Sequence, residues 1–125
     1  MNWTVIGAIF LALAVGMGAF GAHALKGRLD AYSLSVYEKA VFYHFIHALG
    51  IVLISVLART GGVSVTGATR AAWLLAIGIL LFSGSLYALA ISGTRMLGAI
   101  TPFGGVAFIA GWLLLAYEAL RAQRG

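Results

Sequence analysis

Four long apolar segments, separated by short polar connections, constrain this chain more than any other feature of its sequence. They cover residues 3–24, 36–58, 71–92 and 102–120. A helix needs about 20 mainly apolar residues to cross the hydrocarbon core of a membrane. Because backbone groups inside lipid must bond within their own segment, each segment is predicted to be a helix. We expect an all-α fold, a four-transmembrane-helix antiparallel bundle that forms a single integral membrane domain over residues 1–125.

Composition excludes an ordinary soluble fold. Of the 125 residues, 62% are hydrophobic and 9% are charged. A soluble domain has about 45–50% apolar and about 25% charged residues, and a chain this short has too little interior to hide the excess apolar surface. The lipid bilayer is therefore the expected partner. The absence of cysteine excludes disulfides and thiolate metal sites.

The formal net charge is +5, but the eight Lys and Arg residues are scattered singly rather than gathered in a basic patch. Cations near span ends are typical of membrane proteins and contact lipid headgroups, so no nucleic-acid partner is expected. The even number of spans predicts that both termini lie on the same side. The basic residues divide equally, four to each side, so their count leaves the orientation open.

Ala22-His23-Ala24 matches the small-x-small pattern that precedes a signal-peptide cleavage point, and an apolar stretch comes before it. A signal peptide also has a basic start and a shorter apolar region. Residues 1–22 contain no Lys or Arg. We therefore interpret residues 3–24 as a membrane span rather than a cleaved leader.

Small residues recur every four positions on two faces of the first segment and on one face of the third. Such ridges let helix backbones approach closely, which drives association where lipid surrounds both partners. Two small faces on one helix predict either a central place in the bundle or a second neighbour from another subunit. The residues expected to pack helices together are Gly16, Gly18, Ala22, Gly84, Ala88 and Gly111.

Three histidines are the most distinctive polar residues of the apolar segments. His44 and His47 are three positions apart and share a helix face, and His23 ends the first segment on the same side of the membrane. Hydrogen bonds to neighbouring helices are one interpretation; a haem- or metal-binding redox module is the alternative. His47 lies roughly 10 Å inside the apolar run, whereas His23 lies at its boundary. These unequal depths argue against a simple pair of axial ligands, so no cofactor or metal is expected.

Hydroxyl groups in the third segment are the expected partners of these histidines. Ser83 and Tyr87 are four positions apart and share one face, whereas Ser85 points elsewhere. We expect His47 to be buried and neutral and to bond across to another helix. A pocket for a lipid headgroup or small ligand is one interpretation. Interhelical hydrogen bonds alone, worth about 0.6 kcal/mol each in membranes, are the other.

Two acidic residues near span ends are expected to be structural. Glu38 precedes His47 by about two and a half helical turns and so falls on the opposite face. Glu118 and Arg121, three positions apart, are predicted to form an exposed ion pair.

Several motifs resemble the signature of a family of small bacterial inner-membrane proteins, the domain of unknown function 423 or transmembrane-protein-256-like family. They occur in the family's order along nearly the whole chain. They are residues 18–25 (GAFGAHAL), Tyr43 through Leu49, residues 81–87 (LFSGSLY), Ile100-Thr101-Pro102, Gly104-Gly105 and Gly111-Trp112. The resemblance implies a multi-pass protein of the plasma membrane, the bacterial inner membrane, and brings no established activity with it.

We expect a non-enzymatic accessory protein or a lipid- or small-ligand-binding bundle, acting as a homo-oligomer or within a larger membrane complex. A small multidrug-type exporter would need a buried acidic residue, and residues 3–24 contain none. A lipid hydrolase would have only Ser83 or Ser85 with His47 to use. The candidate ligand-binding or polar-cluster residues are His23, His44, His47, Ser83, Ser85, Tyr87, Thr101 and Gly104, with no catalytic residue among them.

Overall fold

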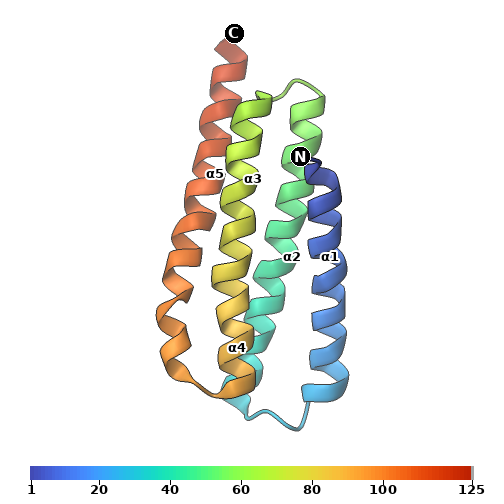
Figure 1. Cartoon of the computed structure of the whole chain (residues 1–125), viewed down its shortest axis with the longest axis vertical. Coiled ribbons are helices and arrows are strands. Elements are labelled where there is room, and N and C mark those ends of the chain that lie inside the picture. The colour runs from blue at the N-terminus through green and yellow to red at the C-terminus, as the bar shows by residue number, and fades with distance from the viewer. Residues whose placement is uncertain (125) are drawn as a thin grey trace.

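The computed structural model describes residues 1–124, which form four antiparallel helical spans, each long and apolar enough to cross a membrane (Figure 1). The elements in chain order are α1 (Trp3–Phe20), the π-helical turn η1 (Gly21–Leu25), α2 (Ala31–Arg59), α3 (Val65–Gly78), the π-helical turn η2 (Ile79–Ser83), α4 (Gly84–Ser92), the 3-10 turn η3 (Arg95–Ala99) and α5 (Thr101–Arg124). The predicted all-α, four-span fold is confirmed.

Side-chain caps start two of the helices earlier than the apolar pattern predicted. The Asp30 carboxylate accepts a hydrogen bond of 2.7 Å from the Ser33 N–H, so α2 begins at residue 31 rather than 36. The Ser64 hydroxyl accepts one of 3.0 Å from the Gly67 N–H, so α3 begins at residue 65 rather than 71. Arg70, placed by the sequence in a connection, therefore lies on a helix.

The turns between spans are short and rely on glycine where the chain reverses. Gly61, in the turn between α2 and α3, has a φ of +82°, a left-handed conformation that other residues rarely adopt. Gly93 ends α4 with a φ of +73°, and its N–H donates to the Leu89 carbonyl at 2.8 Å. Connections this short fix each helix antiparallel to the one before it.

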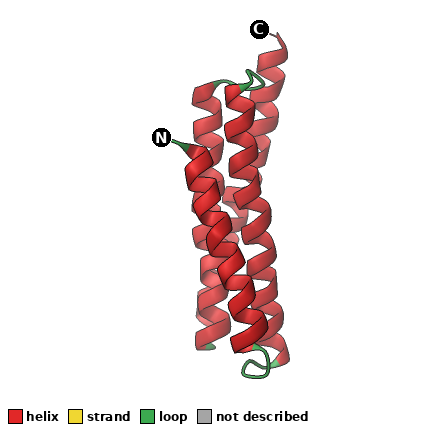
Figure 2. Ribbon diagram, turned by 90° about the vertical axis from the view of Figure 1, so that its right-hand side faces the viewer, coloured by secondary structure: helices red, strands yellow, loops and turns green. Residues whose placement is uncertain are grey.

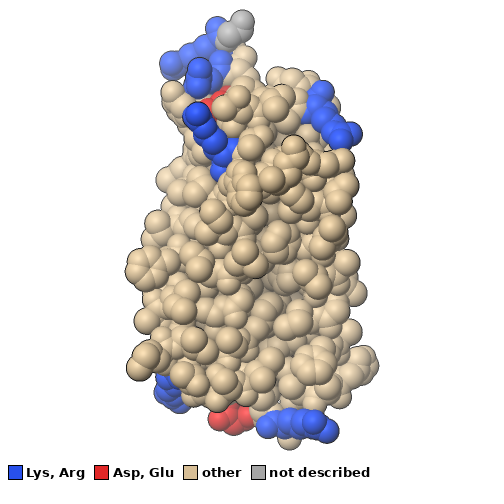
Figure 3. All heavy atoms as spheres, viewed as in Figure 1, with Lys and Arg blue, Asp and Glu red and all other residues tan. Residues whose placement is uncertain are grey.

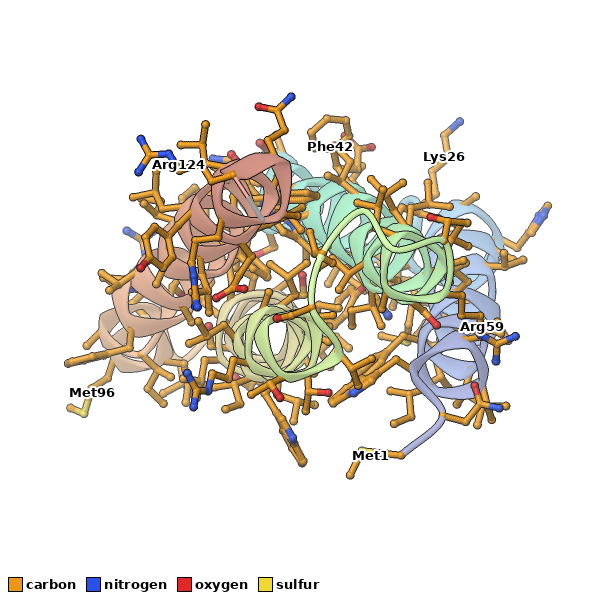
Figure 4. The ribbon with its side chains drawn as sticks, turned by 90° about the horizontal axis from the view of Figure 1, so that it is seen from above. Met1, Lys26, Phe42, Arg59, Met96 and Arg124 are labelled. Carbon is orange, nitrogen blue, oxygen red and sulfur yellow. The ribbon has the colours of Figure 1, made fainter. Side chains whose placement is uncertain are left out.

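The helices are arranged with α2 and the α3–α4 span in the middle, α1 against α2 on one flank, and α5 against α3 and η2 on the other (Figures 1 and 4). The helix α1 is thus an edge helix, and the predicted central place for it within the bundle is wrong. The other expectation, that α1 also packs against a helix of another subunit, remains a prediction.

The interior is built mostly from small and branched apolar side chains of the two middle spans, which reach the flanking helices. Its most buried members include Ala48, Ile51, Ile54, Ala71, Leu75 and Phe108. Large apolar side chains also cover the outside, among them Val5, Ile9, Leu13, Val106, Ile109 and Leu113. On the face shown in Figure 3, charged side chains lie only near the two ends, with a broad uncharged band between them. This surface suits a bilayer.

Figure 2 shows the N- and C-terminal ends toward the same end of the bundle, as the even span count predicts.

A seven-residue repeat, rather than the predicted four-residue ridges, forms the face of the first span that packs on α2. Gly7, Ala14 and Gly21 are all buried. A Cβ atom added at Gly7 would come within 2.6 Å of Val52 Cγ2. Four residues turn a helix about 40° past one revolution, whereas seven fall only about 20° short of two. A four-residue ridge therefore rotates away from the seam.

The predicted packing residues are distributed accordingly. Gly111 packs tightly on α3, since an added Cβ would lie 2.7 Å from Leu75 Cδ2. Gly18 is half-buried at ordinary contact distance from Val41. The others differ from the expectation. Gly16 has no neighbouring atom within 4 Å, and Gly84 has only the Ile79 carbonyl at that distance. The remaining two, Ala22 and Ala88, are exposed.

Candidate functional site

A layer of polar side chains joins α2 to η2 and α4. His44 Nδ1 lies 2.9 Å from the Tyr87 hydroxyl, and the Ser83 hydroxyl donates to the Ala40 carbonyl at 2.8 Å. Ser83 and Tyr87 therefore face the same neighbour, α2, as their spacing predicted. His44 is only 4% exposed. Its Nε2 has no hydrogen-bond partner within residues 1–124.

His47 is buried, as expected, but its hydrogen bond stays within its own helix. Nδ1 lies 2.8 Å from the Tyr43 carbonyl one turn earlier. Because a carbonyl oxygen only accepts, Nδ1 carries the proton. The ring stacks on Phe108 of α5 with centroids 3.5 Å apart. The predicted bond from His47 to another helix is therefore wrong; His44 makes that bond instead.

A second hydroxyl pair joins α4 to α5. The Ser85 hydroxyl donates to the Phe82 carbonyl at 3.0 Å and lies 2.6 Å from the Thr101 hydroxyl, which is left to act as the donor between them. Ser85 therefore points away from Ser83, as predicted. The backbone of Gly104 lies against that of Phe82, and an added Cβ would clash there. Thr101 thus holds α5 onto α4, and Gly104 lets α5 pack closely on η2.

The three histidines do not gather into one site. His23 is exposed on η1, while His44 and His47 are buried and make separate hydrogen bonds. The described part of the chain, residues 1–124, contains no group of three His, Cys, Asp or Glu side chains arranged to hold a metal ion. The alternative that all three histidines share a haem or metal has no support in this arrangement.

The sequence did not predict a groove that lies between the end of the α1 span and the start of α2. Its volume is about 320 Å³. The lining residues are Gly18, Gly21, Ala22, Lys26, Leu34, Tyr37, Glu38 and Val41. Two of them carry opposite charges. The one ion pair within 4 Å in residues 1–124 is that of Glu118 and Arg121, so Lys26 and Glu38 are not paired with each other.

Tyr37 closes the inner end of this groove. Its ring lies against Gly21, where an added Cβ would clash with it. The hydroxyl donates to the Met17 carbonyl at 2.5 Å, and the ring centroid lies 5.2 Å from that of Tyr87. The groove therefore ends on Tyr37 and Tyr87, the aromatic side chains that border the layer of polar side chains around His44. The seven-residue spacing of the small residues Gly7, Ala14 and Gly21 was the available signal for this seam.

The π-helical turn η1 falls within a segment that resembles the family signature, residues 18–25, and η2 overlaps another, residues 81–87. Such turns occur often at functional sites because an extra residue in one turn redirects the side chains around it. Here η1 carries Gly21 at the groove, and η2 carries Ser83 in the polar layer. The two motifs thus meet at one seam, between α1, α2 and α4.

Glu118 is a buried carboxylate, 5% exposed, and the predicted exposed ion pair is wrong on this point. Its Oε2 accepts a hydrogen bond of 3.0 Å from the Ser64 hydroxyl, and Oε1 lies 3.6 Å from exposed Arg121. Gly67 leaves the space that the carboxylate occupies. It therefore locks α5 onto the start of α3.

Antiparallel apolar helices with charged ends and short turns define a multi-pass integral membrane protein of the all-α class. The chain belongs to the family described as Protein of unknown function (DUF423), whose family model matches residues 17–105. The resemblance seen in the sequence is confirmed.

Relatives align along most of their length. UPF0382 membrane protein YwdK of Bacillus subtilis (strain 168) is 47% identical over 118 residues, which cover 94% of each chain. UPF0382 membrane protein SH2409 of Staphylococcus haemolyticus (strain JCSC1435) is 50% identical over 111 residues, or 89% of this chain and 88% of the relative. No solved structure gives a significant match. The predicted location, multi-pass in the plasma membrane, fits the four spans and these bacterial membrane proteins.

Proposed function

We propose that the chain is a non-enzymatic membrane bundle that binds a zwitterionic phospholipid in the groove between the α1 span and α2. One observation carries the proposal: Lys26 and Glu38 line the same groove without pairing with each other, beside apolar walls. Opposite charges that line one groove match a headgroup that itself carries a phosphate and an ammonium.

Phosphatidylethanolamine fits this groove best. Its phosphate would accept hydrogen bonds from the Lys26 ammonium, and its own ammonium would donate to the Glu38 carboxylate. An acyl chain would lie along Leu34 and Val41. Phosphatidylglycerol offers the phosphate but no cation for Glu38. Phosphatidylcholine offers a cation without an N–H donor.

The polar residues elsewhere support a binding role rather than catalysis. Ser83 donates to a backbone carbonyl, Ser85 pairs with Thr101, and neither is bonded to His47. A nucleophile needs a base within hydrogen-bond reach. An exporter would use a buried carboxylate. Among residues 1–124 only Glu118 is one, and Ser64 and Arg121 bind it near one end of α5.

Native mass spectrometry of the purified chain, exchanged into an equal mixture of phosphatidylethanolamine and phosphatidylglycerol, tests the proposal. We expect preferential retention of phosphatidylethanolamine. Glu38→Gln should remove the preference, and Lys26→Gln should lower retention of both lipids by about twofold to fivefold, the range for exposed charge pairs. Lys39→Gln is the matched control, because Lys39 neighbours Glu38 in sequence but does not line the groove.

Equal retention of the two lipids by the unmodified chain would refute the assignment. An equal loss of lipid retention in Lys39→Gln and Lys26→Gln would show a general attraction between basic residues and lipid rather than binding in the groove. The spectra also report stoichiometry, which tests the prediction of a homo-oligomer. The exposed small residues on the outer face of α1, Ala8, Ala12 and Gly16, are where we place a second copy or a larger complex.

A further inference from the structure

A second pocket lies at the opposite end of α1, where the starts of α1 and α3 meet the end of α2. Its volume is about 240 Å³. The polar residues that line it are Asn2, Trp3, Ser55, Arg59 and Thr69. No carboxylate is among its lining residues, which distinguishes it from the groove that contains Glu38.

We propose that this pocket binds the phosphate of an anionic phospholipid in the leaflet opposite to the one served by the first groove. Its polar groups are donors or hydroxyls. Arg59 supplies a guanidinium that forms no ion pair within residues 1–124, and Asn2 uses its carbonyl oxygen to cap α1, through the Val5 N–H, which leaves its amide N–H groups free to donate. The Ser55 hydroxyl already pairs with that of Thr4 at 2.7 Å. An oxyanion is the ligand that accepts from both Arg59 and Asn2.

Trp3 provides an independent indication of a missing acceptor. The side chain is 7% exposed, and its Nε1–H is buried without a hydrogen-bond partner in the described residues. Buried donors in native proteins nearly always have a partner, because leaving one unmet is costly. Trp3 lines the pocket, and a phosphate oxygen that reached Nε1 from there would supply the acceptor. The Trp3 ring is held edge-on against Trp73 at 5.3 Å between centroids, so its position is fixed by packing.

Two helix N-termini add to the positive potential of the pocket. The 18-residue α1 begins at Trp3 and the 14-residue α3 begins at Val65, and both residues line the pocket. The first turn of a helix carries a partial positive charge and unpaired N–H groups, which favour anions. The end of α2, which carries the opposite partial charge, also lines the pocket through Ser55, Ala58 and Arg59. Two helix starts and the Arg59 guanidinium outnumber it, so the pocket favours negative charge over a zwitterion.

The two pockets use the two ends of one edge helix. The first groove lies at residues 18–26 and the second at residues 1–3, and Lys26 and Arg59 both lie on the α1 side of the molecule when it is viewed from above (Figure 4). A helix at the edge of the bundle leaves such openings at both membrane surfaces. The chain would thus hold a zwitterionic lipid at one surface and an anionic lipid at the other.

The test follows the indole N–H resonance of Trp3 in the full chain, in zwitterionic detergent micelles titrated with phosphatidylglycerol. We expect a downfield shift of Trp3 that saturates, with little change at Trp112, and a weaker response to phosphatidylcholine. Trp3→Phe identifies the resonance and keeps the aromatic packing. Arg59→Gln should raise the midpoint of the titration by about twofold to fivefold. Arg70→Gln, with the same charge change at the same end, should leave it unchanged.

Three outcomes would overturn the proposal. The first is a Trp3 resonance that does not move with phosphatidylglycerol. The second is an equal change of midpoint in Arg59→Gln and Arg70→Gln, which would show a general charge effect. The third is an equal response to inorganic phosphate added alone, which would assign the pocket to a free anion rather than to a lipid.

Discussion

The Tyr37 hydroxyl of α2 donates to the Met17 carbonyl of α1 across 2.5 Å, and the Tyr37 ring fills the space left by Gly21. This contact lies where α1 passes into the π-helical turn η1. It fixes the edge helix to the bundle and closes the inner end of the larger groove. The shape of the groove therefore depends on Gly21, because the absence of a side chain there leaves room for the Tyr37 ring.

Gly21→Ala tests this relationship. The added Cβ would clash with the Tyr37 ring, so we expect a destabilisation of about 1–3 kcal/mol, as for overpacking in a core. Thermal unfolding in detergent measures it. Gly16→Ala is the control, because no atom lies within 4 Å of the site of its Cβ. Equal midpoints for both variants would contradict the packing described here.

His44 and Tyr87 supply the second prediction. Either single truncation, His44→Leu or Tyr87→Phe, removes the 2.9 Å bond that joins α2 to α4. Tyr87→Phe also leaves Nδ1 of the buried His44 unpaired, at a cost of about 1–3 kcal/mol. A double-mutant cycle should give a coupling energy of about 0.6–1.7 kcal/mol, the range known for hydrogen bonds between membrane helices. Additive effects would show that the bond contributes nothing measurable.

The spans were predictable because bilayer thickness sets the length of an apolar helix, and no tertiary knowledge is needed to count it. Helix starts were less so. Asp30 and Ser64 extend α2 and α3 beyond the apolar runs through caps, which hydropathy does not register. The direction of Ser83, Ser85 and Tyr87 followed from helical periodicity, because all three lie close together along the chain.

The partners of the histidines and the packing faces of the helices could not be predicted in the same way, because they depend on which side of each helix meets a neighbour. Sequence alone does not give this. His44 and His47 share a helix face, yet one meets Tyr87 and the other stacks on Phe108. Glu118 was expected at the surface because it is charged and near a span end. The space that Gly67 leaves on α3, 51 positions earlier in the chain, lets it be buried.

Glu118 supplies the third prediction. Glu118→Ala should cost about 1–3 kcal/mol, because it leaves the Ser64 hydroxyl without its acceptor and opens a cavity beside Gly67. Arg121→Gln should cost at most about 1 kcal/mol, since Arg121 is 63% exposed and its ion pair is screened. Chemical unfolding of both variants compares them. A surface ion pair would instead give two small and equal effects.

Asp30 supplies a pH dependence whose sign is fixed by its role as a helix cap. The hydrogen bond from the Ser33 N–H, followed by one from the Ser33 hydroxyl, holds the pKa of the Asp30 carboxyl below its ordinary value of 3.8. A carboxyl with a lower pKa in the folded state stabilises fully above the unfolded pKa. That contribution is lost as the pH falls through the folded value, where the carboxylate gains a proton.

Thermal midpoints of the unmodified chain and Asp30→Asn, compared from about pH 6 to about pH 3, should therefore converge as the solution becomes acidic or cross in favour of the variant. Asparagine caps a helix comparably and does not titrate, so the variant keeps the cap and removes only the protonation step. Ser33→Ala keeps the backbone N–H from which Asp30 accepts its hydrogen bond and removes only the hydroxyl, the smaller of the two causes, so it should keep most of the pH dependence. A constant difference between Asp30→Asn and the unmodified chain over this range would show that Asp30 does not contribute through its charge.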